Sequence, residues 1–320
     1  MILIDIESSI SYYINIELNG EKMASNEKKR NTYIIRRVVF CILLICLTVF
    51  LIRKLFLPTH SSGFDFDKLF GEHKLIFFSS NEIEVAEDIQ RNIWNPELFE
   101  TDDSGFMHYN DPSVKTCLGI DVSSFQKDID WNKVKASGID FVFIRAGYRG
   151  NTEGGLFIDP YFETNYEGAK NAGLSIGVYF FSQSINESEA AEEADFVVSL
   201  LKEKELDLPI VFDWEYVSET ARTANITQET MSKCADAFYE RIHQHGFDCM
   251  VYFNLYTSYM IYDMDQFGEK MIWLAQFADK PTYYYHYEIW QYSCTGKIDG
   301  IDTDVDLNIA LDEKITSVIQ

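Results

Sequence analysis

Basic residues are scarce in this chain. Its 320 residues include 27 Lys and Arg against 51 Asp and Glu, which gives a formal net charge of −24. The acidic excess lies beyond residue 60, because the preceding residues contain more Lys and Arg than Asp and Glu. A protein that binds nucleic acid needs a basic face to meet the phosphates. The composition therefore argues against a nucleic-acid partner and indicates an acidic, solvated surface.

Several kinds of reactive site are also missing. The sequence has no CxxC pair and no His/Cys cluster at metal-ligand spacing, so we expect no structural metal and no cofactor. The His residues show no arrangement with a Ser or Cys nucleophile, which gives no support for acyl-transfer chemistry. The cysteines beyond residue 60 allow two disulfides in any of three pairings, or none. These cysteines are Cys117, Cys234, Cys249 and Cys294.

One stretch is apolar enough to enter a membrane. Residues 38–52 contain no charge and have a pair of basic residues on each side. If these long basic side chains snorkel, residues 33–57 cover a hydrocarbon core of roughly 30 Å at about 1.5 Å per residue. A signal peptide is the alternative, but no small-x-small cleavage site follows Ile52. We therefore expect residues 33–57 to be an uncleaved signal anchor that crosses the lipid bilayer.

The flanking charges predict the orientation of this anchor. More basic residues precede the span than follow it, and the more basic flank stays in the cytoplasm. We expect a single-pass protein of the cell membrane, with residues 1–32 as a cytoplasmic tail and the catalytic part outside the cell. Residues 58–116 are interpreted as a stalk or membrane-proximal segment. They contain one helical-looking stretch, from Asn81 to Trp94, with apolar residues near a 3.6-residue period.

From Cys117 onward, short β-rich apolar runs alternate with amphipathic helical stretches. This pattern is typical of a parallel sheet covered by helices, and eight strands predict an α/β fold, an irregular β/α barrel over residues 117–320. The last three strands are too close together for full helices, so we expect an incomplete helix ring. The expected strands are Cys117–Asp121, Phe141–Arg145, Ser175–Phe181, Pro209–Asp213, Met250–Phe253, Met271–Ala275, Glu288–Gln291 and Val305–Leu307. The clearest helices are Trp131–Ser137, Pro160–Ala172, Glu187–Lys204 and Thr227–His245.

Acidic residues stand at the ends of three of these strands. In a parallel barrel, catalytic groups collect where the strands finish. Asp213 and Glu215 follow an apolar run and lie two residues apart, so both carboxyls should face one pocket. Repulsion and burial raise the pKa of one such carboxyl, which can then protonate a leaving glycosidic oxygen. Asp121 and Asp306 occupy comparable places on the first and last strands.

Seven short strings in the same region resemble one enzyme family. Their order and spacing resemble glycoside hydrolase family 25, the lysozymes (muramidases) that cleave the β-1,4 bond between N-acetylmuramic acid and N-acetylglucosamine. The resemblance covers residues 117–310. The strings are Gly119-Ile-Asp-Val-Ser-Ser-Phe-Gln126, Phe143-Ile-Arg-Ala-Gly-Tyr148, Gly177-Val-Tyr-Phe-Phe-Ser182, Phe212-Asp-Trp-Glu215, Trp273-Leu-Ala-Gln-Phe277, Trp290-Gln-Tyr-Ser293 and Val305-Asp-Leu-Asn308.

The resemblance implies roles for the acidic residues. Glu215 matches the general acid, Asp213 matches the carboxylate that assists the reacting sugar, and Asp121 and Asp306 match two further acids that line the site. We expect the sugar's own 2-acetamido carbonyl to attack the anomeric carbon, with direct attack by water as the alternative. Phe180 and Phe277 depart from the family pattern, in which a His and a Tyr are usual at those places, so substrate preference is less well defined than reaction type.

Aromatic residues near the strand ends are candidates for stacking on sugar rings, with core packing as the alternative for each. We expect the partner to be a peptidoglycan glycan strand, and the sequence does not identify protein partners. A catalytically inactive glycan-binding scaffold at the membrane is the competing hypothesis, and a glycosidase of chitin-like polymers is another. The candidates are Tyr179, Trp273, Tyr148, Trp290 and Tyr292, the polar Asn254, and a possible aromatic rim at residues 283–287.

Overall fold

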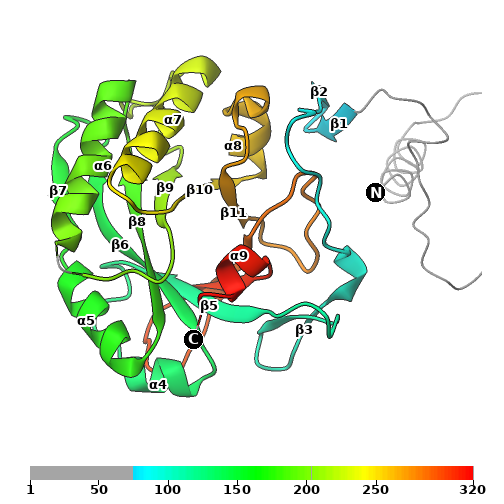
Figure 1. The fold of residues 1–320 in the computed structure, drawn as a ribbon, viewed down its shortest axis with the longest axis vertical. Coiled ribbons are helices and arrows are strands. Elements are labelled where there is room, and N and C mark those ends of the chain that lie inside the picture. Colours follow the sequence, from blue (N-terminus) through cyan, green and yellow to red (C-terminus); the bar gives the residue numbers. More distant parts are fainter. Residues whose placement is uncertain (1–74, 203, 320) are drawn as a thin grey trace, which may run out of the picture. The chain divides into compact units, whose positions relative to one another are not determined.

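A computed structural model describes residues 75–202 and 204–319 (Figure 1). The expected tail at residues 1–32 and the expected membrane anchor at residues 33–57 lie outside this part of the chain. Within it, no helix is both long and apolar enough to cross a membrane. The described residues belong to one compact unit.

Eight strands close into a barrel, as the sequence predicts. Each strand pairs with the next around the barrel, and β13 pairs with β5 to complete the circle, while β7 (Leu156–Ile158) extends the sheet along one end of β6. In order around the barrel the strands are β5 (Cys117–Val122), β6 (Phe141–Arg149), β8 (Ser175–Ser182), β9 (Ile210–Trp214), β10 (Cys249–Asn254), β11 (Met271–Ala275), β12 (Ile289–Gly296) and β13 (Val305–Ala310).

The expectation of an entirely parallel sheet is wrong at one strand. β13 runs antiparallel to both β12 and β5. The connection from Gly296 to Val305 is too short for the crossover that parallel neighbours need, so the chain turns back in a hairpin. The reversal has a consequence for function, because it brings the beginning of β13 to the end of the barrel where the parallel strands finish.

The barrel interior is packed with aromatic and aliphatic side chains. Phe141, Phe143, Val211, Met250 and Trp273 belong to one buried cluster inside it. Two glycines allow this density, because a Cβ at Gly119 would overlap the ring of Phe141 and one at Gly177 would overlap the ring of Phe143. The floor of the barrel is therefore solid, and any ligand must bind above it.

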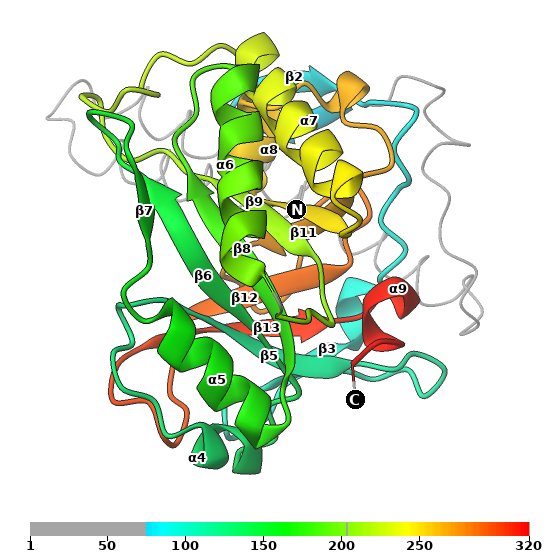
Figure 2. The same ribbon diagram turned by 60° about the vertical axis from the view of Figure 1, so that its left-hand side comes forward.

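Among the described residues, the long helices cover one side of the barrel. α5, α6 and α7 pack against the outer faces of β6, β8, β9 and β10 (Figure 2). No helix lies between β11 and β12 or between β12 and β13, which confirms the incomplete ring. The helices are α4 (Trp131–Ala136), α5 (Phe162–Ala172), α6 (Glu187–Leu201), α7 (Gln228–Gln244), α8 (Leu255–Met260) and α9 (Glu313–Thr316), with 3-10 turns η1 (Pro96–Leu98) and η2 (Met264–Gln266).

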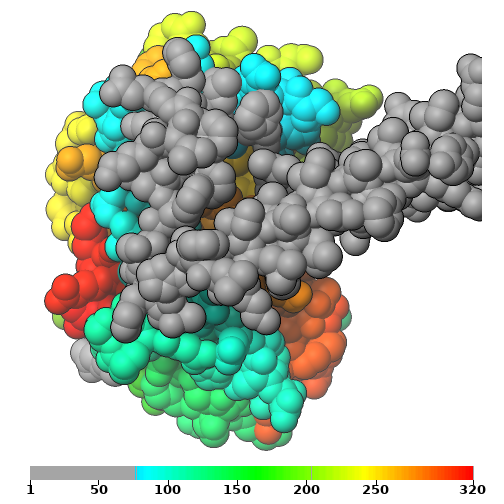
Figure 3. Space-filling view, turned by 90° about the vertical axis from the view of Figure 1, so that its right-hand side faces the viewer, coloured from blue at the N-terminus to red at the C-terminus, as the bar shows by residue number. Residues whose placement is uncertain are grey.

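Residues 75–116, which we call the N-terminal arm, cover the side that lacks helices. Trp94, Phe99 and Met107 of this arm are buried in the same core as the outward-facing residues of the barrel. In Figure 3 the blue-green surface of the arm adjoins the orange and red surface of the C-terminal segments. The described part of the segment that we interpreted as a stalk is thus packed on the barrel.

The helix expected from Asn81 to Trp94 is wrong. This stretch begins with β2 (Asn81–Glu84), which pairs with β1 (Leu75–Phe78). Ser79 and Ser80 both have left-handed φ angles, 47° and 68°, as a two-residue hairpin turn requires. A second hairpin follows, formed by β3 (Phe99–Thr101) and β4 (Met107–Tyr109). The apolar residues of the arm are spaced to fit the barrel surface, and their approach to a helical period is incidental.

Candidate active site

A pocket opens at the end of the barrel where the parallel strands finish. Its volume of about 330 Å³ falls in the range of small-ligand sites. Its walls come from inward-facing strand positions and from the loops that follow them. The lining residues are Asp121, Ser123, Phe125, Gln126, Arg145, Tyr179, Phe181, Asp213, Glu215, Tyr252, Trp273, Phe277, Gln291, Cys294 and Asp306.

Asp213 and Glu215 both border this pocket, as strand alternation predicts. Between them, Trp214 belongs to the core between the barrel and its outer layer. Asp213 lies within the sheet, opposite Phe181 of β8 and Tyr252 of β10. Glu215 lies one residue beyond the end of β9. The sheet therefore fixes the first acid, whereas the second stands at the start of a loop.

Asp121 and Asp306 bring two further carboxyls to the pocket. They face each other directly on the antiparallel strands β5 and β13. Asp121 Oδ2 accepts hydrogen bonds from Gln291 Nε2 at 2.8 Å and from Asn308 Nδ2 at 2.9 Å. These amides fix the orientation of Asp121, and all four acids named from the sequence meet in one place.

Burial raises the pKa of all four acids, and repulsion from neighbouring acids adds to it at Asp121, Asp213 and Glu215. Burial is the largest cause for each, and the charge of Asp306 adds to it at Asp121 and Glu215, while that of Glu215 adds to it at Asp213. Burial raises the pKa of Asp306 to about 6. Near neutral pH such a pocket retains protons on some of its carboxyls, which is the condition for general acid catalysis.

Arg145 is the one cationic residue among those that line the pocket. Its Nε and Nη2 atoms lie 2.8 Å and 2.7 Å from Oδ2 of the buried Asp159, and Nη2 donates to Ser124 Oγ at 3.0 Å. Arg145 lowers the pKa of Asp213, but by less than burial and the neighbouring acids raise it. Because Asp159 already pairs with this arginine, the four carboxyls are left with an excess of negative charge.

Asp213 also has an oxygen without a partner. Its Oδ1 atom is buried and accepts no hydrogen bond from any described residue. Leaving a buried acceptor unpaired costs about 1–3 kcal/mol, so such an atom in a native structure calls for an explanation. Since Asp213 borders the pocket, an N–H donor on a bound ligand would satisfy this oxygen.

Aromatic side chains complete the wall. Tyr179 and Trp273, both expected from the sequence, border the pocket, and so does Tyr252, which was not expected. Trp273 Nε1 donates to Asn308 Oδ1 at 2.8 Å, and the Tyr252 hydroxyl donates to Gln291 Oε1 at 3.0 Å. The two amides that hold Asp121 therefore also hold these two rings.

Trp290 and Tyr292 do not reach the pocket. They occupy outward-facing positions of β12, because Gln291 between them faces inward. The Trp290 ring lies edge-on to Phe99, with centroids 5.0 Å apart, and the Tyr292 hydroxyl accepts a hydrogen bond from Met107 N at 3.2 Å. Both rings bind the N-terminal arm, and the expectation that they contact substrate is not supported.

Tyr148 and Asn254 also have other partners. Asn254 caps α8, with its Oδ1 accepting from Thr257 N at 3.0 Å. Tyr148 lies beside the pocket, stacked on Phe157 with centroids 5.3 Å apart and 5.5 Å from the Arg145 guanidinium. Neither is among the lining residues.

The aromatic rim expected at residues 283–287 is wrong. Tyr285 and Tyr287 are buried. The Tyr285 hydroxyl accepts a hydrogen bond from Ala86 N, and Trp94 Nε1 donates to Tyr287 O, both at 2.9 Å. The N-terminal arm therefore packs on residues 283–287.

Residues that sequence reasoning missed include Arg145, Gln291 and the exposed Phe125. Strand alternation offered a signal for the first two, because each lies two residues after an inward-facing side chain. Of the two departures from the family pattern, Phe277 borders the pocket, whereas Phe180 faces outward, packed against Phe196.

Among the described residues, His286, Glu288 and Asp312 form the one group with donor atoms placed to hold a metal ion. Each of these three residues already has a partner within the protein, while His286 Nδ1 has none among the described residues. His286 Nε2 lies 2.9 Å from Asp312 Oδ2, Glu288 Oε2 accepts from Ile272 N at 2.7 Å, and Asp312 Oδ1 caps α9 by accepting from Lys314 N at 2.8 Å. The described cysteines, buried Cys117, Cys234 and Cys249 and exposed Cys294, are all free thiols.

The family model for glycosyl hydrolases family 25 matches residues 120–301. The autolytic lysozyme of Clostridium acetobutylicum is 30% identical over 192 residues, which are 59% of this chain and 54% of that protein. Lysozyme M1 of Streptomyces globisporus is 29% identical over 203 residues, with 59% of this chain and 66% of that protein covered. The chain thus spans about half to two thirds of these relatives.

The fold is also similar to a solved structure from the same family. The structure of a family 25 glycosyl hydrolase from Bacillus anthracis superposes with a TM-score of 0.53 at 27% sequence identity. The superposition covers 65% of this chain and 94% of that one.

Proposed function

This chain belongs to glycosyl hydrolases family 25, and on that premise we propose that it is a peptidoglycan hydrolase of the lysozyme type. The bond cleaved would be the β-1,4 linkage between N-acetylmuramic acid and N-acetylglucosamine. The observation that carries the proposal is the meeting of Asp213 and Glu215 in one pocket, with both pKa values raised by burial first and then by neighbouring acids. Two carboxyls of this kind are what glycoside hydrolysis requires.

In the proposed reaction Glu215 is the general acid. Its raised pKa lets Glu215 keep its proton to a higher pH than an ordinary glutamate, and the proton passes to the glycosidic oxygen as the bond to the anomeric carbon breaks. The half-buried position of Glu215 at the start of the loop after β9 suits this role, because the acid must approach a leaving group that lies across the mouth of the pocket.

Asp213 is proposed to orient the sugar's 2-acetamido group. Its unpaired Oδ1 would accept the amide N–H, which directs the acetamido carbonyl oxygen toward the anomeric carbon. The carbonyl oxygen then forms the new bond as the leaving oxygen takes the proton from Glu215, and water later opens the cyclic intermediate. Direct attack by water activated by Asp121 or Asp306 is the alternative route, and it inverts the anomeric configuration.

We also propose that residues 33–57 anchor the protein in the cell membrane, with the barrel outside the cell. The support is the uncharged run at residues 38–52 with basic residues on both sides. Peptidoglycan lies outside the membrane, so this placement would put the pocket next to its substrate.

The test of the proposed function is the full chain carrying Glu215→Gln, assayed by the loss of turbidity of a cell-wall suspension. We expect the rate to fall by at least about 100-fold, a typical contribution of general acid catalysis. Near-normal turnover by this variant would show that Glu215 is not the acid. An inactive wild-type chain that binds glycan as tightly as the variant would indicate a scaffold instead.

The bond specificity has a separate test. Mass spectrometry of the soluble products identifies the sugar at the new reducing end. A muramidase leaves N-acetylmuramic acid there, whereas an enzyme that leaves N-acetylglucosamine, or that digests a chitin-like polymer faster than peptidoglycan, would have a different specificity from the one proposed.

A further inference from the structure

The position of Glu215 is not determined by the sheet. Ser182 and Trp214 are the last residues that pair between β8 and β9, and Glu215 comes next along the chain. Among the described residues, nothing donates a hydrogen bond to its carboxyl, and burial and the charge of Asp306 alone shift its pKa. The direction of this side chain therefore depends on how firmly its backbone is held.

Gln183 holds that backbone. Its Nε2 atom donates to Glu215 O at 3.0 Å and to Ser182 O at 2.8 Å, and its Oε1 atom accepts from Thr223 Oγ1 at 2.6 Å. The side chain is fully buried. Carbonyl oxygens only accept hydrogen bonds, so the amide has a single orientation that satisfies all three partners. The amide thus adds one hydrogen bond between the two chain segments just beyond the last paired residues of β8 and β9.

We propose that Gln183 is a positioning residue that fixes the direction of Glu215 by holding its backbone carbonyl. The inference rests on the proposed role of Glu215 as the general acid. It adds a residue that determines the direction in which the Glu215 carboxyl points. Proton transfer in the transition state requires the acid within hydrogen-bond reach of the leaving oxygen, so small displacements are costly.

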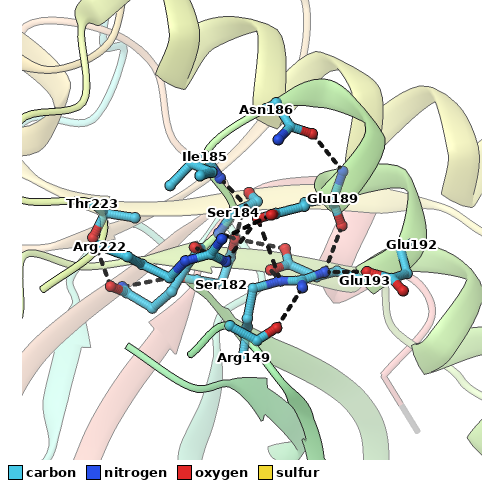
Figure 4. Close-up of polar contacts among 12 residues, drawn as sticks. Arg149, Ser182, Ser184, Ile185, Asn186, Glu189, Glu192, Glu193, Arg222 and Thr223 are labelled. Atoms are coloured by element: carbon cyan, nitrogen blue, oxygen red, sulfur yellow. Dashed lines mark hydrogen bonds and ion pairs between the residues drawn. The ribbon is translucent and has the colours of Figure 1, made fainter. Parts of the chain in front are cut away.

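Gln183 is itself anchored to the outer wall of the barrel. Arg222 Nη1 donates to Gln183 O at 3.2 Å, and the two Nη atoms of Arg222 bind the two carboxylate oxygens of Glu189 at 2.7 Å and 2.8 Å (Figure 4). Arg149 Nη2 donates to Glu189 O at 3.0 Å. These contacts join the end of β6, the loop after β8, the first turn of α6 and the loop after β9, so the backbone that carries the Gln183 amide is held from several sides.

The experiment compares two substrates on the full chain carrying Gln183→Met, which keeps the volume and removes both N–H donors. One substrate is a soluble peptidoglycan fragment, whose leaving oxygen needs a proton. The other is a 2,4-dinitrophenyl glycoside of N-acetylmuramic acid, whose leaving group departs without one. We expect kcat on the fragment to fall about 10- to 100-fold with KM changed less than about threefold, and kcat on the aryl glycoside to change less than about threefold.

Two further variants distinguish an effect on the direction of the Glu215 side chain from an effect on folding. Thr223→Val removes the hydrogen bond that orients the Gln183 amide, and it should give the same substrate-dependent loss in weaker form. Ser184→Ala is the matched control, because Ser184 is equally buried in the same loop and its hydroxyl pairs with Ser182 Oγ at 3.0 Å without contacting Glu215. This control should leave the ratio of the two kcat values unchanged.

Several results would overturn the inference. They are equal losses on both substrates for Gln183→Met and Thr223→Val, a loss confined to KM, and a Ser184→Ala control that shows the same substrate dependence. The proposed function fails differently, through a wild-type chain that cleaves neither substrate or through a Glu215→Gln variant with normal activity on the fragment. In that case the inference about Gln183 falls with it.

Discussion

Two groups of acids, each at least partly buried, lie on opposite sides of the barrel wall. The pocket holds Asp121, Asp213, Glu215 and Asp306 inside the barrel. The other group, which we call the outer ion cluster, consists of Glu189 and Glu193 of α6 with Arg149 of β6 and Arg222 of the loop after β9 (Figure 4). Consecutive residues of β8 contact the two groups. Phe181 borders the pocket, and the Ser182 hydroxyl donates a hydrogen bond to Glu193 at 2.6 Å.

The two groups differ in their counter-charges. In the outer ion cluster, Arg149 Nε lies 2.7 Å from Glu193 Oε1, and Arg222 binds both oxygens of Glu189. Burial still raises the pKa of Glu193 to about 7, against hydrogen bonds from Ser182 and Arg149 that lower it. In the pocket, the single arginine is bound by Asp159. A paired buried acid supports the fold, whereas acids left unpaired in a cavity are available for chemistry.

The largest effect should come from breaking the outer ion cluster. Arg149 is 4% exposed, and the variant Arg149→Met leaves Glu193 buried without its cation. We expect the free energy of unfolding to fall by about 3–5 kcal/mol, the usual result of removing one partner of a buried pair. Urea unfolding followed by fluorescence measures it.

The double variant Arg149→Met/Glu193→Gln is the matched control. It removes the unpaired charge as well as the cation, so it should recover part of the lost stability. A double variant no more stable than Arg149→Met would mean that the unpaired charge of Glu193 is not the source of the loss.

In the pocket, removing an acid should raise the free energy of unfolding instead of lowering it. Asp213→Asn relieves repulsion from Glu215 and Asp121, which help raise the pKa of Asp213 after burial. We expect unfolding to cost about 1 kcal/mol more than in the wild type, the trade-off typical of functional sites. The rate of peptidoglycan cleavage should fall at least about tenfold, because the neutral amide oxygen of Asn is a weaker acceptor for the acetamido N–H than a carboxylate and supplies no negative charge. A variant that is less stable than the wild type would place Asp213 with the structural acids.

Much of the barrel could be predicted from sequence, because each strand and helix there has its own local pattern. The strand alternation around Asp213 also located the pocket correctly. The N-terminal arm could not be predicted in this way. The positions of Ala86, Ile89 and Trp94 are set by contacts with a surface formed more than 150 residues later in the chain, and tertiary contacts override a weak helical period.

The same long-range contacts explain the errors at the site. Trp290 and Tyr292 stand at strand positions like those of true pocket residues, and only the register of β12 decides which face they occupy. Gln183 carries no motif at all. Its importance depends on the end of the β8–β9 ladder and on Thr223, a residue that sequence alone does not bring near.

The smallest effect should follow Asp306→Asn, which keeps the shape of the pocket and removes one charge. Burial raises the pKa of Asp306 from 3.8 to about 6 in the folded protein, so folding favours its protonated form. The stability that this group contributes is present below about pH 4 and is lost as the pH rises through about 6. The variant should therefore lose less stability than the wild type between about pH 4 and about pH 7, as measured by urea unfolding at a series of pH values.

The same substitution should shift the pH dependence of catalysis. The charge of Asp306 adds to burial in raising the pKa of Glu215, so its removal lowers that pKa. The alkaline limb of the kcat profile, where a general acid loses its proton, should move to lower pH in Asp306→Asn. Arg149→Met, measured beside it, should leave the limb in place, because the outer ion cluster is not among the causes that shift the pKa of Glu215. A limb that moves in Arg149→Met but not in Asp306→Asn would mean that the two groups of acids are not electrostatically separate.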